Sequence, residues 1–398
     1  MVFGAVLVQA VTIGCVFSYG VFFTVLENEF GWSRTLLSVA SAIAFFNMGF
    51  FAIAAGHLSD KFGPRGVLLF TAMCTGGAYM LMYFLSAPWQ LIVIYGLFVA
   101  LGLGSHDVVT LSTVARWFPR RRGVMSGVVK VGTALGQMSI PVVAAALIAA
   151  IGWRSAFLVQ GIGAAVILVV AAWLLGLKPS APLKEGSPDI TADKNEGISI
   201  SEARQTTDLR TLCAIQFFFF GAVITIPTHI VPHSIDSGLT AVQAASILSV
   251  IAAFSIVGRL FIGRFTDTIG SRRAYMFCLA LLFFSLASLL FIKDAKLLYV
   301  FGMFYGVAHG GLFTVVAPTV AEYFGMRSHG SIFGVIVFTG TIGGSMLPII
   351  TGLIFDKLGS YQWAFVLIAS MVLVSLLLSF RLSPKRSPRL SPGLTGRL

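Results

Sequence analysis

Charge and cysteine are scarce in this sequence. Only 11% of the 398 residues are charged, whereas a soluble domain carries about 25%. The four cysteines lie apart in apolar segments, with neither metal-ligand nor disulfide spacing, so we expect buried free thiols. A soluble globular fold, a cysteine metal cluster and a disulfide framework are therefore all disfavoured.

Catalytic patterns are missing as well. The sequence has neither a cysteine cluster nor a glycine-rich phosphate loop of the Walker type. We therefore expect no enzyme activity, no cofactor and no metal site. A membrane sensor would need an output domain, and the polar segment at residues 178–208 is too short for one.

Long hydrophobic runs dominate instead. Mean hydropathy is +0.93, and apolar stretches of about 20 residues recur along the chain. Such a stretch crosses a hydrocarbon core of roughly 30 Å as an α-helix. We predict an all-α membrane protein with twelve transmembrane helices. The predicted spans are residues 1–26, 35–57, 65–86, 88–115, 122–150, 153–177, 209–235, 240–264, 272–292, 296–323, 329–355 and 360–380.

Basic residues gather on one side of these spans. Of the 27 lysines and arginines, 20 fall on the side of segment 178–208 and five on the other, while Lys130 and Arg259 lie inside spans. This asymmetry predicts a cell (inner) membrane protein with both termini in the cytoplasm. It also accounts for the net charge of +12 without a nucleic-acid partner.

The second half of the chain repeats the first. The charged loop "GHLSDKFGPRG" at 56–66 recurs as "GRFTDTIGSRR" at 263–273, displaced by 207 positions. Two parallel six-helix repeats are typical of transporters that hold their substrate between the halves. We predict an N-terminal six-helix bundle at 1–177, a cytoplasmic linker at 178–208, a C-terminal six-helix bundle at 209–380 and a basic cytoplasmic tail at 381–398.

The loop pattern Gly-x-Leu-x-Asp-x-x-Gly-x-Arg resembles the signature of the major facilitator superfamily. In that family the loop is taken to latch the two halves together in the outward-open state. The same residues also suit a plain tight turn with glycines at positive φ and a helix-capping aspartate. The resemblance implies a conformational latch made of Gly56, Asp60, Gly63, Arg65, Asp267 and Gly270.

Four further segments resemble the monocarboxylate transporter branch and its bacterial relatives, including the oxalate–formate exchanger type. They are "SYGVFFTVLENEFGWSR" (18–34), "RWFPRRRGVMSG" (116–127), "GWRSAF" (152–157) and "YGVAHGGLFTVVAPTVAEYFG" (305–325). This resemblance implies a carrier of small organic anions such as lactate or pyruvate, working by alternating access with proton symport. We also expect a monomer. Anion exchange, and a membrane sensor without transport activity, are the alternatives.

Arg259 is the first candidate for substrate binding. It lies seven residues before Thr266, roughly 10 Å inside a span, where an ionisable group is a functional candidate. In the resembled family an arginine here binds the substrate carboxylate, which suits the planar guanidinium. The alternative is an arginine that extends to the membrane surface. Animal members carry an aspartate where this chain has Ser255 and a lysine where it has Phe23, so their proton-coupling scheme does not transfer directly.

The other charges inside spans belong to neighbouring helices. Asp107, preceded by His106, lies in the fourth span and Lys130 in the fifth, so the carboxylate and the ammonium can pair. A structural ion pair is one interpretation. The other is that Asp107 or His106 carries the coupled proton, or that Lys130 is a second anion-binding charge.

Three polar side chains complete the predicted site. His309 lies near the midplane of the tenth span, and it either binds a carboxylate, carries a proton or is structural. Tyr19 matches a tyrosine that faces the cavity in the resembled family, where it would bind substrate. Asn47 in the second span is a further cavity candidate.

Overall fold

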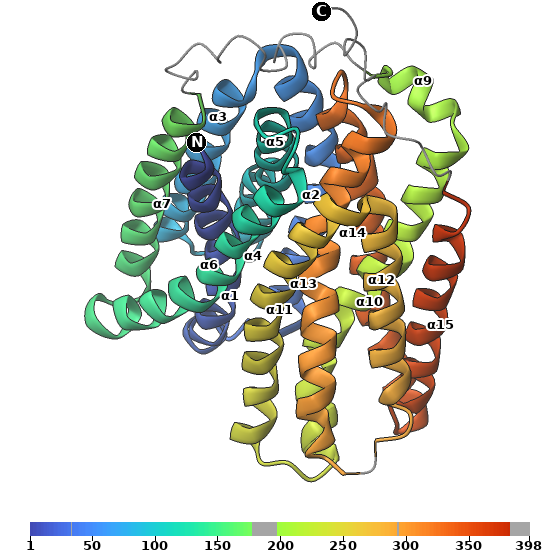
Figure 1. Cartoon of the computed structure of the whole chain (residues 1–398). Coiled ribbons are helices and arrows are strands. Elements are labelled where there is room, and N and C mark those ends of the chain that lie inside the picture. The colour runs from blue at the N-terminus through green and yellow to red at the C-terminus, as the bar shows by residue number, and fades with distance from the viewer. Residues whose placement is uncertain (33, 177–196, 293, 383–398) are drawn as a thin grey trace, which may run out of the picture.

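The computed structural model describes residues 1–32, 34–176, 197–292 and 294–382 (Figure 1). Within these residues the first half consists of α1 (Val2–Phe30), α2 (Arg34–Phe62), α3 (Pro64–Leu81), a 3-10 turn (Met82–Phe84), the continuous run α4 (Pro88–Val93), η2 (Ile94–Val99) and α5 (Ala100–Trp117), then α6 (Arg122–Ile151) and α7 (Trp153–Gly176). The second half consists of the short α9 (Ile200–Gln205) and then α10 (Thr207–Asp236), α11 (Ala241–Ile269), α12 (Ser271–Ser288), α13 (Leu297–Phe324), α14 (His329–Leu358) and α15 (Gln362–Ser379).

The predicted spans correspond to these helices one by one. Eleven helices of the described chain are long and apolar enough to cross a membrane. The helix α12 lies at the predicted span 272–292 and is not among these eleven. Its mean hydropathy is lowered by Arg272 and Arg273 at its start. The helix α2 continues to Phe62, five residues past its predicted end, because helical structure extends beyond the apolar stretch.

Most of the predicted linker and tail lies outside the described residues. The exception is the end of the linker, where α9 begins with a capping box: Ser199 Oγ accepts from the Glu202 backbone N–H, and the Glu202 carboxylate accepts from the Ser199 backbone N–H. The Ser199 backbone N–H also holds the pKa of the exposed Glu202 carboxyl below its usual range. The boundaries at 177, 208 and 380 stay predictions.

A single glycine makes each of the two repeated turns. Gly63, at φ 86°, joins α2 to α3, and Gly270, at φ 90°, joins α11 to α12. Residues with a Cβ are strained at this φ, so the turn requires glycine. We call the end of the helices at which these two turns lie the basic end, because the charged loops lie there.

The two halves meet through glycines at the basic end. A Cβ on Gly127 of α6 would overlap the carbonyl oxygen of Arg259 on α11, and a Cβ on Gly334 of α14 would overlap that of Ala52 on α2. Gly334 lies 207 positions after Gly127, and Ala52 lies 207 positions before Arg259. The two contacts are therefore equivalent under the internal repeat. The same arrangement recurs one helical turn closer to the basic end, where Gly123 packs against Gly263 and Gly330 packs against Gly56.

These contacts place the halves against each other at one end. In Figure 1, α6 and α11 adjoin in the upper part of the molecule, and α6 then runs away from α11 toward the lower left. The helices α2 and α14 lie side by side where Gly56 and Gly330 face each other. The structure is therefore closed between the halves at the basic end.

The glycine contacts lead to a prediction about stability. In Gly127→Val the added side chain meets a backbone carbonyl that cannot move aside, so overpacking costs about 1–3 kcal/mol of unfolding free energy. Thermal unfolding of the purified protein in detergent measures this loss. Gly77→Val is the matched control, because nothing lies within 4 Å of a Cβ at Gly77. Equal unfolding midpoints for the two variants would contradict the prediction.

Candidate substrate site between the two halves

An ion pair lies inside the first half. The Lys130 ammonium on α6 is 2.5 Å from the Asp107 carboxylate on α5, and Lys130 is 2% exposed. His106 Nε2 lies 3.4 Å from the same carboxylate oxygen. The pairing that the sequence allowed is thus present, and the positive charge of Lys130 is compensated within its own half.

Gln9 of α1 holds this pair in place. Its side-chain amide donates to Asp107 Oδ1 and to Thr110 Oγ1, both at 2.9 Å, and its carbonyl accepts from Thr133 Oγ1 at 2.9 Å. Three helices are therefore tied together around one carboxylate. The sequence analysis did not single out Gln9, Thr110 or Thr133. One signal was available, because Gln9 recurs 207 positions later as Gln216.

Arg259 supplies a second buried cation from the other half. It is 2% exposed, so the guanidinium does not extend to the surface as the alternative interpretation would require. Its Nε and Nη1 have no hydrogen-bond partner among the described residues. Its charge acts on both Asp107 and Lys130, which places the three charges together between the halves. Buried guanidinium nitrogens without partners cost free energy and favour an anionic ligand.

Aromatic residues of α13 complete the cluster. The Lys130 ammonium lies 5.1 Å from the ring centroid of Phe313, so a cation of the first half faces a ring of the second. The ring of His309 lies 5.0 Å from that of Phe313, and its Nδ1 is 3.0 Å from Ser255 Oγ on α11. Ser255 precedes Arg259 by one helical turn. His309 is therefore held beside the arginine by a neutral partner.

The charged residues break the internal repeat. Positions 207 away from Asp107, Lys130 and Arg259 are occupied by Thr314, Val337 and Ala52. The glycine contacts show that Ala52 and Arg259 occupy equivalent places in the two halves. The fold therefore repeats, whereas the chemistry of the cluster occurs once.

The predicted latch residues fall into two groups. The Asp60 carboxylate accepts from the backbone N–H groups of Gly330 and Ser331, at 3.1 and 2.8 Å, at the start of α14, and Arg116 pairs with it. The Asp267 carboxylate accepts from Gly123 N and Val124 N at the start of α6, at 2.7 and 2.9 Å. Each half thus caps a helix of the other, where unpaired N–H groups favour an anion.

The remaining loop residues stay within their own half. The guanidinium of Arg65 lies 3.5 Å from the ring centroid of Trp173 on α7, so it does not reach the second half. Gly63 and Gly270 form the turns, and Gly56 packs directly on Gly330. Cross-half hydrogen bonding in this network therefore comes from the two aspartates.

Tyr19 and Asn47 already have partners in the first half. The Tyr19 hydroxyl donates to the Leu37 carbonyl at 2.9 Å, and the side chain is 5% exposed. The Asn47 amide donates to the Gly96 carbonyl at 2.9 Å. Both join α2 to a neighbouring helix, so the structure does not bring either into the charge cluster by any described contact.

Comparison with known proteins identifies the family. The model of the Major Facilitator Superfamily matches residues 5–295 and 213–396. The chain belongs to the major facilitator superfamily. It is a membrane transporter rather than an enzyme. The predicted all-α fold of two six-helix repeats is confirmed.

Sequence relatives of this superfamily member include monocarboxylate transporters. Monocarboxylate transporter 12 of Rattus norvegicus is 25% identical over 389 residues, covering 90% of this chain and 79% of the relative. Monocarboxylate transporter 13 of Bos taurus is 26% identical over 376 residues, covering 94% of this chain and 86% of the relative. The fucose:proton symporter FucP of Escherichia coli shares the fold, with a TM-score of 0.74 at 14% identity, covering 97% of this chain and 99% of that one.

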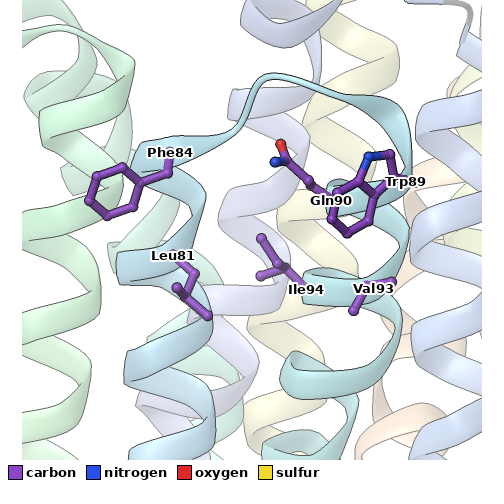
Figure 2. Close-up of a pocket in the computed structure, with 6 residues that line it drawn as sticks. All are labelled: Leu81, Phe84, Trp89, Gln90, Val93 and Ile94. Carbon is purple, nitrogen blue, oxygen red and sulfur yellow. The ribbon is translucent and has the colours of Figure 1, made fainter.

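The superfamily member also has a small pocket far from the charges. It lies at the end opposite the basic end, where α3 turns into α4, and is lined by Leu81, Phe84, Trp89, Gln90, Val93 and Ile94 (Figure 2). The Gln90 side-chain carbonyl is engaged by the backbone N–H groups of Ser86 and Ala87. The lining is otherwise apolar, and it contains none of the predicted site residues.

The ion pair leads to a prediction for the superfamily member. Asp107→Asn or Lys130→Met alone leaves one buried group without its partner, which costs about 3–5 kcal/mol. The double variant removes both charges and costs less than the sum of the singles. Unfolding free energies of the four proteins in detergent measure this coupling, and additive losses would show that the pair contributes no interaction energy.

Proposed function

We propose that this transporter carries small monocarboxylates, such as lactate or pyruvate, together with protons. It works by alternating access in the cell (inner) membrane, with the basic end and both termini in the cytoplasm. The observation that carries the proposal is the buried guanidinium of Arg259, whose Nε and Nη1 have no hydrogen-bond partner in the part of the chain that the structure describes. A carboxylate accepts two hydrogen bonds from such a group in one plane.

Counting charges supports a substrate with one negative charge. Lys130 is neutralised by Asp107, so Arg259 remains as one uncompensated positive charge in the cluster. A monocarboxylate balances this charge, whereas a dicarboxylate needs a second cation. That cation is available only when Asp107 is protonated and releases Lys130. The monovalent anion is therefore the better match.

The same pair supplies a route for proton coupling. A substrate carboxylate beside Asp107 is a second negative charge, which favours protonation of one of the two. One proton and one monoanion together add no net charge to the buried cluster. The loaded and the empty protein then reorient with the same net buried charge, so loading adds no desolvation penalty for a further net charge. His106, 3.4 Å from the carboxylate, is the neighbouring group for proton exchange.

His309 is placed to contact the substrate as a neutral side chain. Its Nδ1 is engaged by Ser255, and its Nε2 has no hydrogen-bond partner among the described residues. The ring is partly exposed. It lies next to Arg259 and Phe313, so a carboxylate bound at Arg259 would meet both an aromatic surface and a polar ring nitrogen. Tyr19 and Asn47 position α2 in this proposal and do not bind substrate.

Closure at the basic end defines the state of the carrier. We assign the structure to the outward-facing state, held by Asp60 of α2, which caps the start of α14, and by Asp267 of α11, which caps the start of α6. Reorientation breaks these two helix caps and separates the glycine contacts. The names of the two monocarboxylate transporter relatives agree with this substrate class.

The role of Arg259 is tested by uptake of labelled lactate into proteoliposomes under an inward proton gradient. Arg259→Gln removes the guanidinium and lowers the uptake rate at subsaturating lactate roughly 30-fold or more, as expected for loss of 2–5 kcal/mol from a buried charged contact. Arg264→Gln is the matched control, because Arg264 is an exposed arginine of the same helix. Equal uptake by both variants would limit Arg259 to a structural role.

The role of Asp107 is tested by comparing two transport modes. Asp107→Asn cannot take up a proton, so accumulation driven by the proton gradient is lost. Counterflow of labelled lactate against internal lactate needs no net proton movement and persists. Both rates are normalised to folded protein, because the substitution also removes an ion pair. If the variant still accumulates lactate in response to the gradient, another group carries the proton.

Anion exchange gives a different result in the same vesicles. An exchanger of the oxalate–formate type takes up label only when the vesicles contain a counter-anion. A symporter takes up lactate into empty vesicles as long as the proton gradient lasts. Uptake that depends on internal anion and ignores the gradient would replace symport by exchange.

A further inference from the structure

A histidine joins the two halves at the basic end. His329, the first residue of α14, is fully buried. Its Nε2 lies 2.9 Å from the Ala317 carbonyl on α13, and its Nδ1 lies 2.8 Å from Ser112 Oγ on α5 of the other half. The contact with Ser112 therefore exists only while the basic end is closed.

The chemistry of the two partners fixes the form of the ring. A carbonyl oxygen only accepts, so Nε2 carries the hydrogen and donates to Ala317. In the neutral imidazole Nδ1 is then the acceptor, and the Ser112 hydroxyl donates to it. Both nitrogens of the neutral ring are satisfied. A proton on Nδ1 would remove this acceptor and bury a charge.

The charged neighbours also oppose a proton on His329. Asp60 on α2, Arg116 on α5 and Arg122 on α6 act on the ring, and α13 contributes the backbone carbonyl of Ala317. Arg116 and Arg122 act against a positive charge on the ring, and Asp60 acts in favour of one. Asp60 is in addition committed to Arg116 and to the start of α14. A positively charged imidazolium is thus unfavourable in the closed state.

We propose that His329 makes the conformational equilibrium sensitive to pH at the basic end, with protonation favouring the state in which this end is open. When the halves separate, Ser112 leaves the ring and water can reach Nδ1. Because the open state binds the proton and the closed state does not, a fall in pH shifts the equilibrium toward the open state. Acid on that side then keeps the binding site facing it and slows further uptake.

The size of the effect follows from the ordinary pKa of histidine. With a pKa of about 6.5 for the hydrated ring, lowering the pH from 7.5 to 5.5 multiplies the odds of the open state about tenfold. The inference rests on the alternating access of the proposed function. It needs no substrate, so failure to transport lactate would leave its test intact.

The test measures distances between spin labels at the end opposite the basic end. Labels attached at Ser86→Cys and Ser237→Cys, one exposed position in each half, report whether that end is open or closed. The protein, with its four native cysteines replaced, is placed in lipid nanodiscs at pH 7.5 and 5.5. We expect the odds of the conformation with this end closed to rise about tenfold at pH 5.5.

Three variants assign the effect to His329. His329→Gln cannot titrate in this range and loses the pH response. His57→Gln, the same change at an exposed histidine of α2, keeps the response. Ser112→Ala keeps the titrating ring but removes its donor, so the basic end opens more often already at pH 7.5.

Two results would overturn the inference. One is a distance distribution of the histidine-containing protein that does not change between the two pH values. The other is an equal pH response in His329→Gln. If His329→Gln does not fold, Ser112→Ala decides: distances equal to those of the unmodified protein at pH 7.5 would show that the contact does not hold the closed state.

Discussion

The backbone contact between α6 and α11 at Gly127 is the constraint on which the site depends. Gly127 lets the Arg259 carbonyl approach to a distance that no other residue would allow. The guanidinium is thereby buried between the halves, next to the Lys130 ammonium and the Asp107 carboxylate. Charges in such surroundings must be compensated. Lys130 is paired with Asp107, whereas Nε and Nη1 of Arg259 have no hydrogen-bond partner among the described residues.

Repetition and asymmetry serve different purposes in this molecule. The glycine contacts and the two helix-capping aspartates occur in both halves with the same spacing, so the interface is nearly symmetric at the basic end. A symmetric interface can open and close as a unit, because its two halves share the same geometry. Asp107, Lys130 and Arg259 have no charged equivalents. The buried charge cluster therefore occurs once, whereas the contacts between the halves occur twice.

The aspartates Asp60, Asp267 and Asp107 differ in how their negative charges are compensated. Asp60 and Asp267 accept from backbone N–H groups of the opposite half, so these bonds last only while the halves touch. Asp107 is held by Gln9 and Lys130 within its own half, and its environment does not depend on closure in the same way. The first two suit a contact that is made and broken. The third suits a group that responds to the charge of a bound ligand.

The sequence by itself determined the membrane fold, the twelve helices and the repeat, because hydrophobic length and a 207-residue spacing are properties of the chain alone. It also marked Asp107, Lys130 and Arg259, since charges inside apolar spans are conspicuous. Only the tertiary structure decided which of them are compensated, because Gln9, Thr110 and Thr133 are ordinary polar residues until three helices bring them together. It likewise showed that Tyr19 and Asn47 donate to backbone carbonyls, which no sequence pattern shows, while their role in substrate binding stays a prediction.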